Sequence, residues 1–306
     1  MEQQRYRAFH TEMKKLFGSR VDRITINAGM TCPNIDGSKA KGGCTFCQDA
    51  SFTGLTFYQN PKPLKEQIEE GMAYLKTRYP SQKFFVYFQN GTNTYAPPSR
   101  LRQMYEEALS FPEIVGLFIS TRPDCFTEAH FDLLEELNQK TYLWVELGIP
   151  SHREEINRRL NRAHTLEDFE NSVGELTQRG IRVCAHVILG LPGESPDEMQ
   201  EKAAYFNRFP LSGIKVHNLV VFKDTVLEKQ FLAGAYEPIT LEDYAARCVD
   251  FLEYLNPNLM VQRLNAHGPK RITVAPDWSV NKLATLNAVH AELEKRDAWQ
   301  GKKWVP

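Results

Sequence analysis

The chain has no long hydrophobic run. None of its 306 residues lies in a stretch that approaches the roughly 18 apolar residues of a membrane span. The first residues, MEQQRYRAFHTEMKK, are polar and charged, and they lack the apolar core of a signal peptide. These absences predict a cytoplasmic protein without membrane contact, whose thiols stay reduced.

Strong net charge and compositional bias are also absent. The formal net charge is −1, which argues against strong attraction of the whole protein to nucleic acid but is compatible with a local basic patch. With 42% hydrophobic and 25% charged residues, the composition is that of a folded enzyme. There is no internal repeat or low-complexity tract, so we expect one large barrel-type domain or two ordinary domains.

Short β-rich and helical segments alternate through the first two-thirds of the chain. Several β-rich segments are nearly continuously apolar, as strands covered on both faces must be. The expected strands are 24–28, 84–89, 115–120, 142–147, 182–189 and 213–220. The expected helices are about 63–78, 99–111, 127–139, 165–179, 196–208 and 240–255. Six such units are too few for an eight-fold barrel, so the pattern predicts an α/β fold with either a curved, open six-unit barrel or a doubly wound sheet.

The chain divides into two predicted parts. Residues 1–220 are expected to form the barrel, including an N-terminal helix, and residues 221–306 a C-terminal α/β extension packed on it. In the extension we expect an irregular stretch rich in Pro and Asn at 256–271, a short strand near 272–275 and a last helix around 281–297.

Three cysteines, Cys32, Cys44 and Cys47, directly follow the first expected strand. Three thiolates can hold three irons of a four-iron cluster and leave the fourth iron open to a substrate or cosubstrate. Their position suits an active site, because sites in parallel α/β folds form at the carboxyl ends of strands. The insert before Cys44 is rich in Pro, Asn, Asp and Gly, which lets it loop out and return.

Two other interpretations of these cysteines remain open at this point. Zinc usually takes four ligands, or three with a histidine, yet the nearest histidine is His10 and no second C-x2-C pair is present. The grouping could also be a chance cluster of buried thiols, as we expect of Cys125, Cys184 and Cys248. The alternative function is therefore a non-catalytic metal-binding or redox-sensing module.

The cysteine spacing C-x11-C-x2-C resembles the cluster motif of the radical S-adenosylmethionine (radical SAM) superfamily. The long insert is similar to that of the YhcC-like family and of the Elongator catalytic subunit. Further similar segments are YFQNGTNTY at 87–95, STRPDC at 120–125, WVELGI at 144–149, INRRLNRAHT at 156–165 and CAHVILGLPGES at 184–195.

The resemblance implies a partial (β/α)6 TIM-like barrel and a [4Fe-4S] cluster on Cys32, Cys44 and Cys47. It also implies that S-adenosylmethionine binds the open iron. A one-electron reductant such as flavodoxin or ferredoxin would then drive cleavage to a 5′-deoxyadenosyl radical. The substrate stays open between RNA, suggested by the Elongator resemblance and the basic stretch before residue 24, and a small molecule or peptide. Acetyl transfer is not expected, because the Elongator subunit's acetyltransferase domain has no counterpart here.

The resemblance further assigns residues to S-adenosylmethionine. Arg162 would approach the methionyl carboxylate, and Ser120 the ribose. Many relatives carry Gln or Glu where this chain has Pro150, so one ribose contact is missing and Glu146 is the residue that could compensate. The remaining assignments are the turn at Gln89, Asn90, Gly91 and Thr92 for the amino group, His186 inside the barrel, and the backbone at Leu189 for adenine.

Each assignment has a plainer structural interpretation. The turn could be an ordinary βα turn, Arg162 a solvated helix-face arginine, and His186 a hydrogen-bonded core histidine. The sequence leaves these alternatives open.

Overall fold

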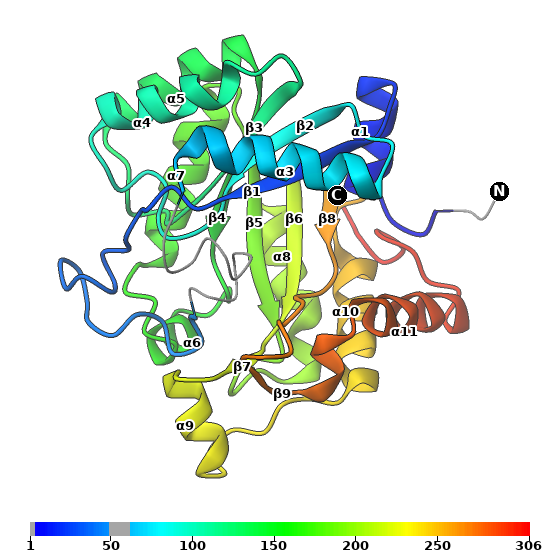
Figure 1. Ribbon diagram of the computed structural model, residues 1–306. Helices are drawn as coiled ribbons and strands as arrows, with labels where there is room; N and C mark the ends of the chain where they lie inside the picture. The colour runs from blue at the N-terminus through cyan, green and yellow to red at the C-terminus, as the bar shows by residue number, and fades with distance from the viewer. Residues whose placement is uncertain (1–3, 49–61) are drawn as a thin grey trace.

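Seven parallel strands form one curled, open sheet, which makes a half barrel (Figure 1). The computed structural model describes residues 4–48 and 62–306. The strands are β1 (Val21–Ile26), β2 (Lys83–Phe88), β3 (Ile114–Thr121), β4 (Tyr142–Gly148), β5 (Arg182–Leu189), β6 (Gly213–Asn218) and β8 (Met260–Arg263). They lie in the sheet in this order, and every neighbouring pair is parallel. The predicted α/β class and partial barrel are confirmed.

Helices cover the outer face of the sheet (Figure 1). Strand residues that face them, such as Val86, Leu117 and Val145, are fully buried. Helices bury the outer face of the strands, and aromatic side chains inside the half barrel bury much of the inner face. Burial on both faces explains why the strands are nearly continuous apolar runs in the sequence. The helices after the N-terminal one are α3 (Leu64–Arg78), α4 (Pro98–Leu109), α5 (Glu128–Lys140), α6 (Glu154–Arg159), α7 (Leu166–Gln178), α8 (Met199–Asn207), α9 (Val226–Leu232), α10 (Leu241–Tyr254) and α11 (Lys282–Lys295). Of these, α9 packs against the small strand β7 (Val221–Phe222) and α11 against α10 rather than on the main sheet.

One strand lies where the sequence predicts irregular structure. β8 falls within 256–271 and pairs with β6, with Arg263 opposite Lys215. Its four residues are too few for a periodic signal, and they are surrounded by Pro and Asn. The sheet therefore takes a seventh strand from beyond residue 220, and the division at that residue stays a prediction.

A small antiparallel pair, β7 (Val221–Phe222) and β9 (Thr273–Ala275), lies beyond the carboxyl end of the main sheet. β9 coincides with the short strand expected near 272–275.

The N-terminal segment closes the amino ends of the strands. The backbone N–H of Val261 donates to the Arg7 carbonyl at 2.8 Å, which attaches the segment to β8. Helix α1 (Phe9–Phe17) then buries Phe9 and Met13 against aromatic side chains of the barrel interior. The amino end of the half barrel is thus filled by apolar packing, which leaves the carboxyl end for a site.

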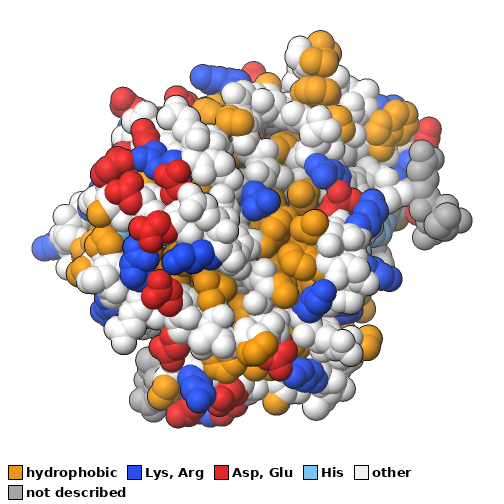
Figure 2. Space-filling model, turned by 90° about the horizontal axis from the view of Figure 1, so that it is seen from above, with side chains coloured by type: hydrophobic (Ala, Val, Ile, Leu, Met, Phe, Trp, Pro, Cys, Tyr) orange, Lys and Arg blue, Asp and Glu red, His pale blue; other side chains and the backbone are white. Residues whose placement is uncertain are grey.

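The surface at the amino end mixes charges of both signs. Seen from above, this face carries both acidic and basic side chains, and an apolar area lies near its middle (Figure 2). This agrees with a net charge near zero. In the part of the chain that the structure describes, no helix has the length and apolar character needed to cross a membrane.

Candidate functional site

A cavity at the carboxyl ends of the strands brings the three cysteines together with most of the other predicted residues. Of the predicted set, Cys32, Cys44, Cys47, Gln89, Gly91, Thr92, Ser120, Arg162 and His186 line it. Pro150 also lines the cavity and contributes no polar side chain, as expected. Asn90, Glu146 and Leu189 are buried and do not belong to its wall.

The cysteine loop is folded by its own backbone hydrogen bonds. The Ile35 N–H donates to the Cys32 carbonyl at 2.8 Å, and the Cys47 N–H donates to the Cys44 carbonyl at 3.0 Å. Gly42 and Gly43 have φ values of 83° and 71°, in the left-handed region that glycine adopts without strain. The long insert therefore returns Cys32 to the same cavity as the C-x2-C pair.

Residues after α6 hold this loop in place. The side-chain amide of Asn161 donates to the carbonyls of Lys41, at 3.0 Å, and Gly43, at 2.7 Å. The Thr45 N–H donates to the Leu160 carbonyl at 3.0 Å. The loop and α6 accordingly lie side by side, as Figure 1 shows.

Two side-chain donors lie near the sulfur of Cys44. Arg162 Nη1 is 3.4 Å from Sγ, and Asn34 Nδ2 is 3.5 Å from it. Donors at these positions suit an anionic sulfur such as a metal-bound thiolate. Arg162 is thus a cavity residue, and the alternative of a solvated helix-face arginine does not hold.

Several contacts fix the direction of Arg162. Its Nη2 donates to the Gly148 carbonyl at 2.7 Å, and its Nε donates to His164 Nε2 at 3.0 Å. Burial and the charges of Arg162 and Arg122 lower the pKa of His164 to about 3, so the imidazole is neutral and can accept. At Gly148, a Cβ would lie 3.0 Å from Arg162 Nη2, so glycine leaves room for the guanidinium.

The sequence reasoning missed a buried ion pair behind Arg162. Arg122 Nη1 donates to the Arg162 carbonyl at 2.8 Å, and Arg122 forms a two-pronged pair with Asp124 at 2.9 and 3.0 Å. The flanking residues Asn161 and Ala163 have φ values of 54° and 53°, a conformation that is costly for a residue with a Cβ. Arg122 and Asp124 both lie in the STRPDC segment at 120–125, and their closeness in the sequence was the signal that could have predicted this ion pair.

The turn after β2 packs against the cysteine loop. The Thr92 N–H donates to the Thr31 carbonyl at 3.0 Å. Gly91 has a φ of 68°, and a Cβ there would lie 2.2 Å from the Met30 carbonyl oxygen. Only glycine allows the backbone at residue 91 to come this close to Met30. This close packing and the Thr92–Thr31 hydrogen bond fix the position of the turn relative to the cysteine loop.

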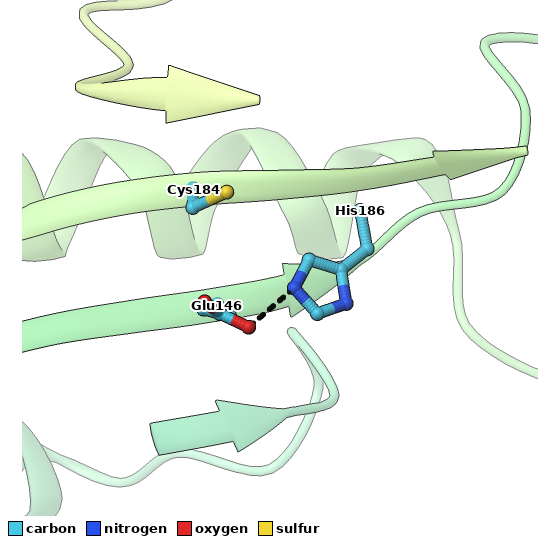
Figure 3. Close-up of side chains that lie close together, drawn as sticks. All are labelled: Glu146, Cys184 and His186. Atoms are coloured by element: carbon cyan, nitrogen blue, oxygen red, sulfur yellow. Dashed lines mark hydrogen bonds and ion pairs between the residues drawn. The ribbon is translucent and has the colours of Figure 1, made fainter. Parts of the chain in front are cut away.

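Glu146 and His186 face each other across β4 and β5 (Figure 3). The Glu146 carboxylate is fully buried, and its Oε2 lies 2.6 Å from His186 Nε2 and 2.8 Å from Lys215 Nζ. Burial and the Lys215 charge lower the pKa of His186 to about 4, so the ring is neutral near pH 7. Its one proton lies on Nε2 toward Glu146, which leaves Nδ1 as an acceptor.

Sequence reasoning also missed the cations that surround Glu146. Lys215 Nζ donates to the Tyr87 hydroxyl at 2.7 Å, and Arg23 Nη1 lies 3.6 Å from Glu146 Oε1. These residues occupy inward positions of their strands, where a period of two places alternate side chains. Strand alternation was the signal that could have found them.

Glu146, Cys184 and His186 form the one group of three or more metal-ligand side chains within the described residues whose ligand atoms all lie within 4.8 Å (Figure 3). The carboxylate already faces Lys215 and Arg23. A metal cation would have to compete with both of these charges, so this group is better explained as an ion-pair network.

Three of the six cysteines, Cys32, Cys44 and Cys47, line the cavity, which fits a cluster held by three thiolates. The other three, Cys125, Cys184 and Cys248, are buried and do not line the cavity. Burial raises the pKa of Cys248 to about 12, and burial with the Asp124 charge raises the pKa of Cys125 to about 12. These two thiols stay protonated, as expected of structural cysteines.

Two family models match the chain. The model of the radical SAM superfamily matches residues 37–206, and the model of the radical SAM C-terminal domain matches residues 211–295.

Related sequences match over nearly the whole chain. YtqA of Bacillus subtilis is 38% identical over 300 residues, which cover 98% of this chain and 93% of YtqA. YhcC of Escherichia coli K12 is 33% identical over 302 residues, which cover 97% of this chain and 96% of YhcC. A tRNA uridine(34) acetyltransferase of Dehalococcoides mccartyi is 27% identical over 286 residues, covering 82% of this chain and 61% of that protein.

Solved structures share the fold. The Methanocaldococcus infernus protein Elp3 has a TM-score of 0.70 and 18% identity, covering 92% of this chain and 64% of that one. Streptococcus suis SuiB bound to S-adenosylmethionine has a TM-score of 0.53 and 14% identity, covering 83% of this chain and 53% of that one. At these identities the likeness shows the half-barrel fold.

Proposed function

The chain belongs to the radical SAM superfamily, and we propose that it is an enzyme that cleaves S-adenosylmethionine reductively with a [4Fe-4S] cluster. The observation that carries this proposal is the convergence of Cys32, Cys44 and Cys47 on one cavity at the carboxyl ends of the strands. Three thiolates without a fourth leave one iron free for a cosubstrate.

The protein residues would hold and insulate this cofactor. When reduced by a one-electron donor such as flavodoxin or ferredoxin, the bound cluster would supply the electron that splits S-adenosylmethionine into methionine and a 5′-deoxyadenosyl radical. Arg162 and Asn34 place donors beside the Cys44 sulfur. Ile35 and Phe46 line the same cavity with apolar surface, which would keep water from a reactive intermediate.

We assign the S-adenosylmethionine contacts to polar groups of the cavity. The Arg162 guanidinium suits the methionyl carboxylate, and the turn at 89–92 suits the amino group. Ser120 and the free acceptor Nδ1 of His186 suit ribose hydroxyls. Glu146 would act on the nucleoside only through His186, because its carboxylate contacts His186 Nε2 and does not line the cavity.

The backbone near Leu189 is the proposed adenine contact. Leu189 itself packs into the outer core, but Val187 and Ile188 of the same strand line the cavity. Asn90 is buried within the turn after β2, so its proposed contribution to the amino-group site is to that turn's shape.

For the substrate, RNA is the class that the named relatives support. A relative of 27% identity is named a tRNA uridine(34) acetyltransferase. This chain spans 61% of that protein's length, so acetyl transfer is not carried over. Comparison of modified nucleosides from cells with and without the gene tests this assignment, and an unchanged nucleoside profile would remove it.

Metal analysis tests the cluster. Anaerobic reconstitution is expected to give about four irons and four sulfides per chain. Cys44→Ala should lose this content, whereas the matched variant Cys125→Ala, which alters a buried protonated thiol, should keep it. Zinc without iron in the purified protein would instead favour the non-catalytic metal-binding module.

A further inference from the structure

The barrel interior below the cavity carries more positive than negative charge. Arg23 on β1, Lys215 on β6 and Arg263 on β8 lie around the single carboxylate of Glu146. Arg23 and Lys215 share Glu146 as their ion-pair partner. Within the described residues, no second carboxylate pairs with any of these three cations.

Arg263 stands out among them. Its side chain is only partly exposed, and it has neither a hydrogen-bond acceptor nor an ion-pair partner among the residues that the structure describes. Removing a guanidinium from water without acceptors is costly, so a site of this kind is expected to receive an acceptor from elsewhere. On the neighbouring strand Lys215 lies opposite it, so the two charges are adjacent in the sheet.

Three buried side-chain atoms in or beside this group lack a hydrogen-bond partner in the described part of the chain, and one of them is Glu146 Oε1, an acceptor that lies 3.6 Å from Arg23 Nη1. Nε2 of Gln262 is a buried donor, while the Oε1 atom of that residue accepts from Arg23 at 2.6 Å. Nε2 of His217 is buried without a hydrogen bond, and His217 lines the cavity. An amide donor of Gln262 and an imidazole nitrogen of His217, both without a hydrogen-bond partner, therefore accompany the unpaired charge of Arg263.

The cations affect one another. Burial lowers the pKa of Lys215 to about 8, and the charges of Arg23 and Arg263 act in the same direction against the opposing effect of Glu146. Burial and then the Arg23 charge lower the pKa of Arg263 as well. The positive charge of the interior thus suits an anion. A metal ion at Glu146, Cys184 and His186 would instead increase the excess of positive charge (Figure 3).

We propose that Arg23, Lys215 and Arg263 bind an oxyanion of the substrate, a phosphate or carboxylate group, below the S-adenosylmethionine cavity. The inference rests on the proposed function, because it assigns the oxyanion to that enzyme's substrate. Tyr87 and His217 connect the two regions: both line the cavity, and the Tyr87 hydroxyl accepts from Lys215 at 2.7 Å. A guanidinium offers two parallel donors to an oxyanion, which neither Tyr87 nor His217 can do.

Inorganic phosphate and acetate serve as probes on the anaerobically reconstituted full chain, at constant ionic strength. Titration calorimetry should show saturable binding of at least one of them. Arg263→Gln should weaken that binding by about tenfold or more, because it removes charged hydrogen bonds. Arg208→Gln, which removes an arginine at the end of α8, should leave it unchanged. Tighter binding of phosphate or of acetate identifies which oxyanion the site prefers.

The unfolding temperature without added anion separates this role from a structural one. The Arg263 side chain makes no hydrogen bond or ion pair with the described residues, so Arg263→Gln should unfold at the same temperature as the wild type or higher. Arg263→Lys should keep part of the affinity. A clear loss of stability together with unchanged anion binding would overturn the proposal.

The same samples separate the two proposals. Suppose that the wild-type protein forms 5′-deoxyadenosine. If it binds neither phosphate nor acetate saturably, or if Arg263→Gln binds the anion as tightly as the wild type does, the oxyanion site is overturned and the proposed enzymatic function still stands. Protein that holds no iron but shows anion binding dependent on Arg263 overturns the enzyme and supports the oxyanion site.

Discussion

Arg162 Nη1 lies 3.4 Å from the sulfur of Cys44, and the same guanidinium donates to the Gly148 carbonyl at 2.7 Å. One side chain therefore joins the cysteine loop to the carboxyl end of β4. The arginine is held by the backbone of 161–163, where two residues adopt positive φ values, and by the Arg122–Asp124 pair behind it. Its position depends on several contacts rather than on rotamer preference alone.

The first prediction concerns this arginine. Arg162→Gln should weaken S-adenosylmethionine binding to the reconstituted protein by about tenfold to a hundredfold, because a charged bidentate contact is lost. Arg158→Gln is the matched control, since Arg158 is an exposed arginine of α6. Equal affinities for the cosubstrate in both variants and the wild type would remove Arg162 from the site.

The second prediction concerns the turn after β2. Gly91→Ala should lower the free energy of unfolding by about 2 to 4 kcal/mol, because the new Cβ would meet the Met30 carbonyl at a φ of 68°. Gly174→Ala in α7 should instead raise it by up to about 1 kcal/mol, because nothing lies within 4 Å of that Cβ. Denaturant unfolding measures both, and similar effects would contradict the packing of the turn against the loop.

The third prediction concerns acid stability. Burial disfavours the Asp124 carboxylate, but hydrogen bonds from Arg122 and Lys39 outweigh it and lower its pKa to about 2. The folded-state pKa is below the unfolded value of about 3.9, so the contribution is present above that value and is lost as the pH falls through about 4 to 2. It amounts to about 2 to 3 kcal/mol at neutral pH.

Asp124→Asn should therefore lose about this free energy of unfolding at pH 7 and show a weaker pH dependence between 4 and 2. Denaturant unfolding at several pH values measures it. If the variant and the wild type lost stability in parallel over this range, Asp124 would not be the group responsible.

The fourth prediction concerns the pH dependence of anion binding. The titratable and charged groups around the Lys215 ammonium in the described residues are Arg23, Tyr87, Glu146, Cys184, His186, His217 and Arg263. Burial lowers the pKa of Lys215 to about 8, so its charge is present below this pH and is lost above it. The affinity for inorganic sulfate, whose own charge stays constant here, should fall about tenfold between pH 8 and 9.5.

Lys215→Met is the control for this effect. It should bind sulfate more weakly than the wild type at pH 7 and lose the step near pH 8. A wild-type affinity that stays constant across pH 7 to 9.5 would show that Lys215 does not contribute its charge to the site.

Local sequence signals predicted most of the elements. The helix expected at 165–179 is present as α7, and Thr165 caps its start, with the Asp168 N–H donating to the Thr165 hydroxyl at 3.0 Å. Long apolar runs located the strands from β2 to β6, because burial on both faces leaves a continuous signal. β8 was not predicted, because four residues in a polar surrounding are too few to show a periodic pattern of apolar residues.

The site was predictable to the extent that it is local in sequence. The three cysteines and the turn at 89–92 follow strand ends, so their convergence follows from the parallel topology. Strand alternation places Lys215 and Arg23 on the inward face of their strands, but their pairing with Glu146 was not predictable, because it joins β4 to β6 and β1 across the curled sheet. Which inward-facing side chains meet there depends on the curvature of the sheet, which local propensity does not encode.

The most direct test of the account is the formation of 5′-deoxyadenosine from S-adenosylmethionine by the reconstituted protein with dithionite as reductant. We expect the wild type and Cys125→Ala to form it and Cys44→Ala to form none, because Cys44 is a proposed cluster ligand and Cys125 does not line the cavity. Wild-type protein with a full cluster that never cleaves S-adenosylmethionine, or Cys44→Ala with unchanged turnover, would contradict the account.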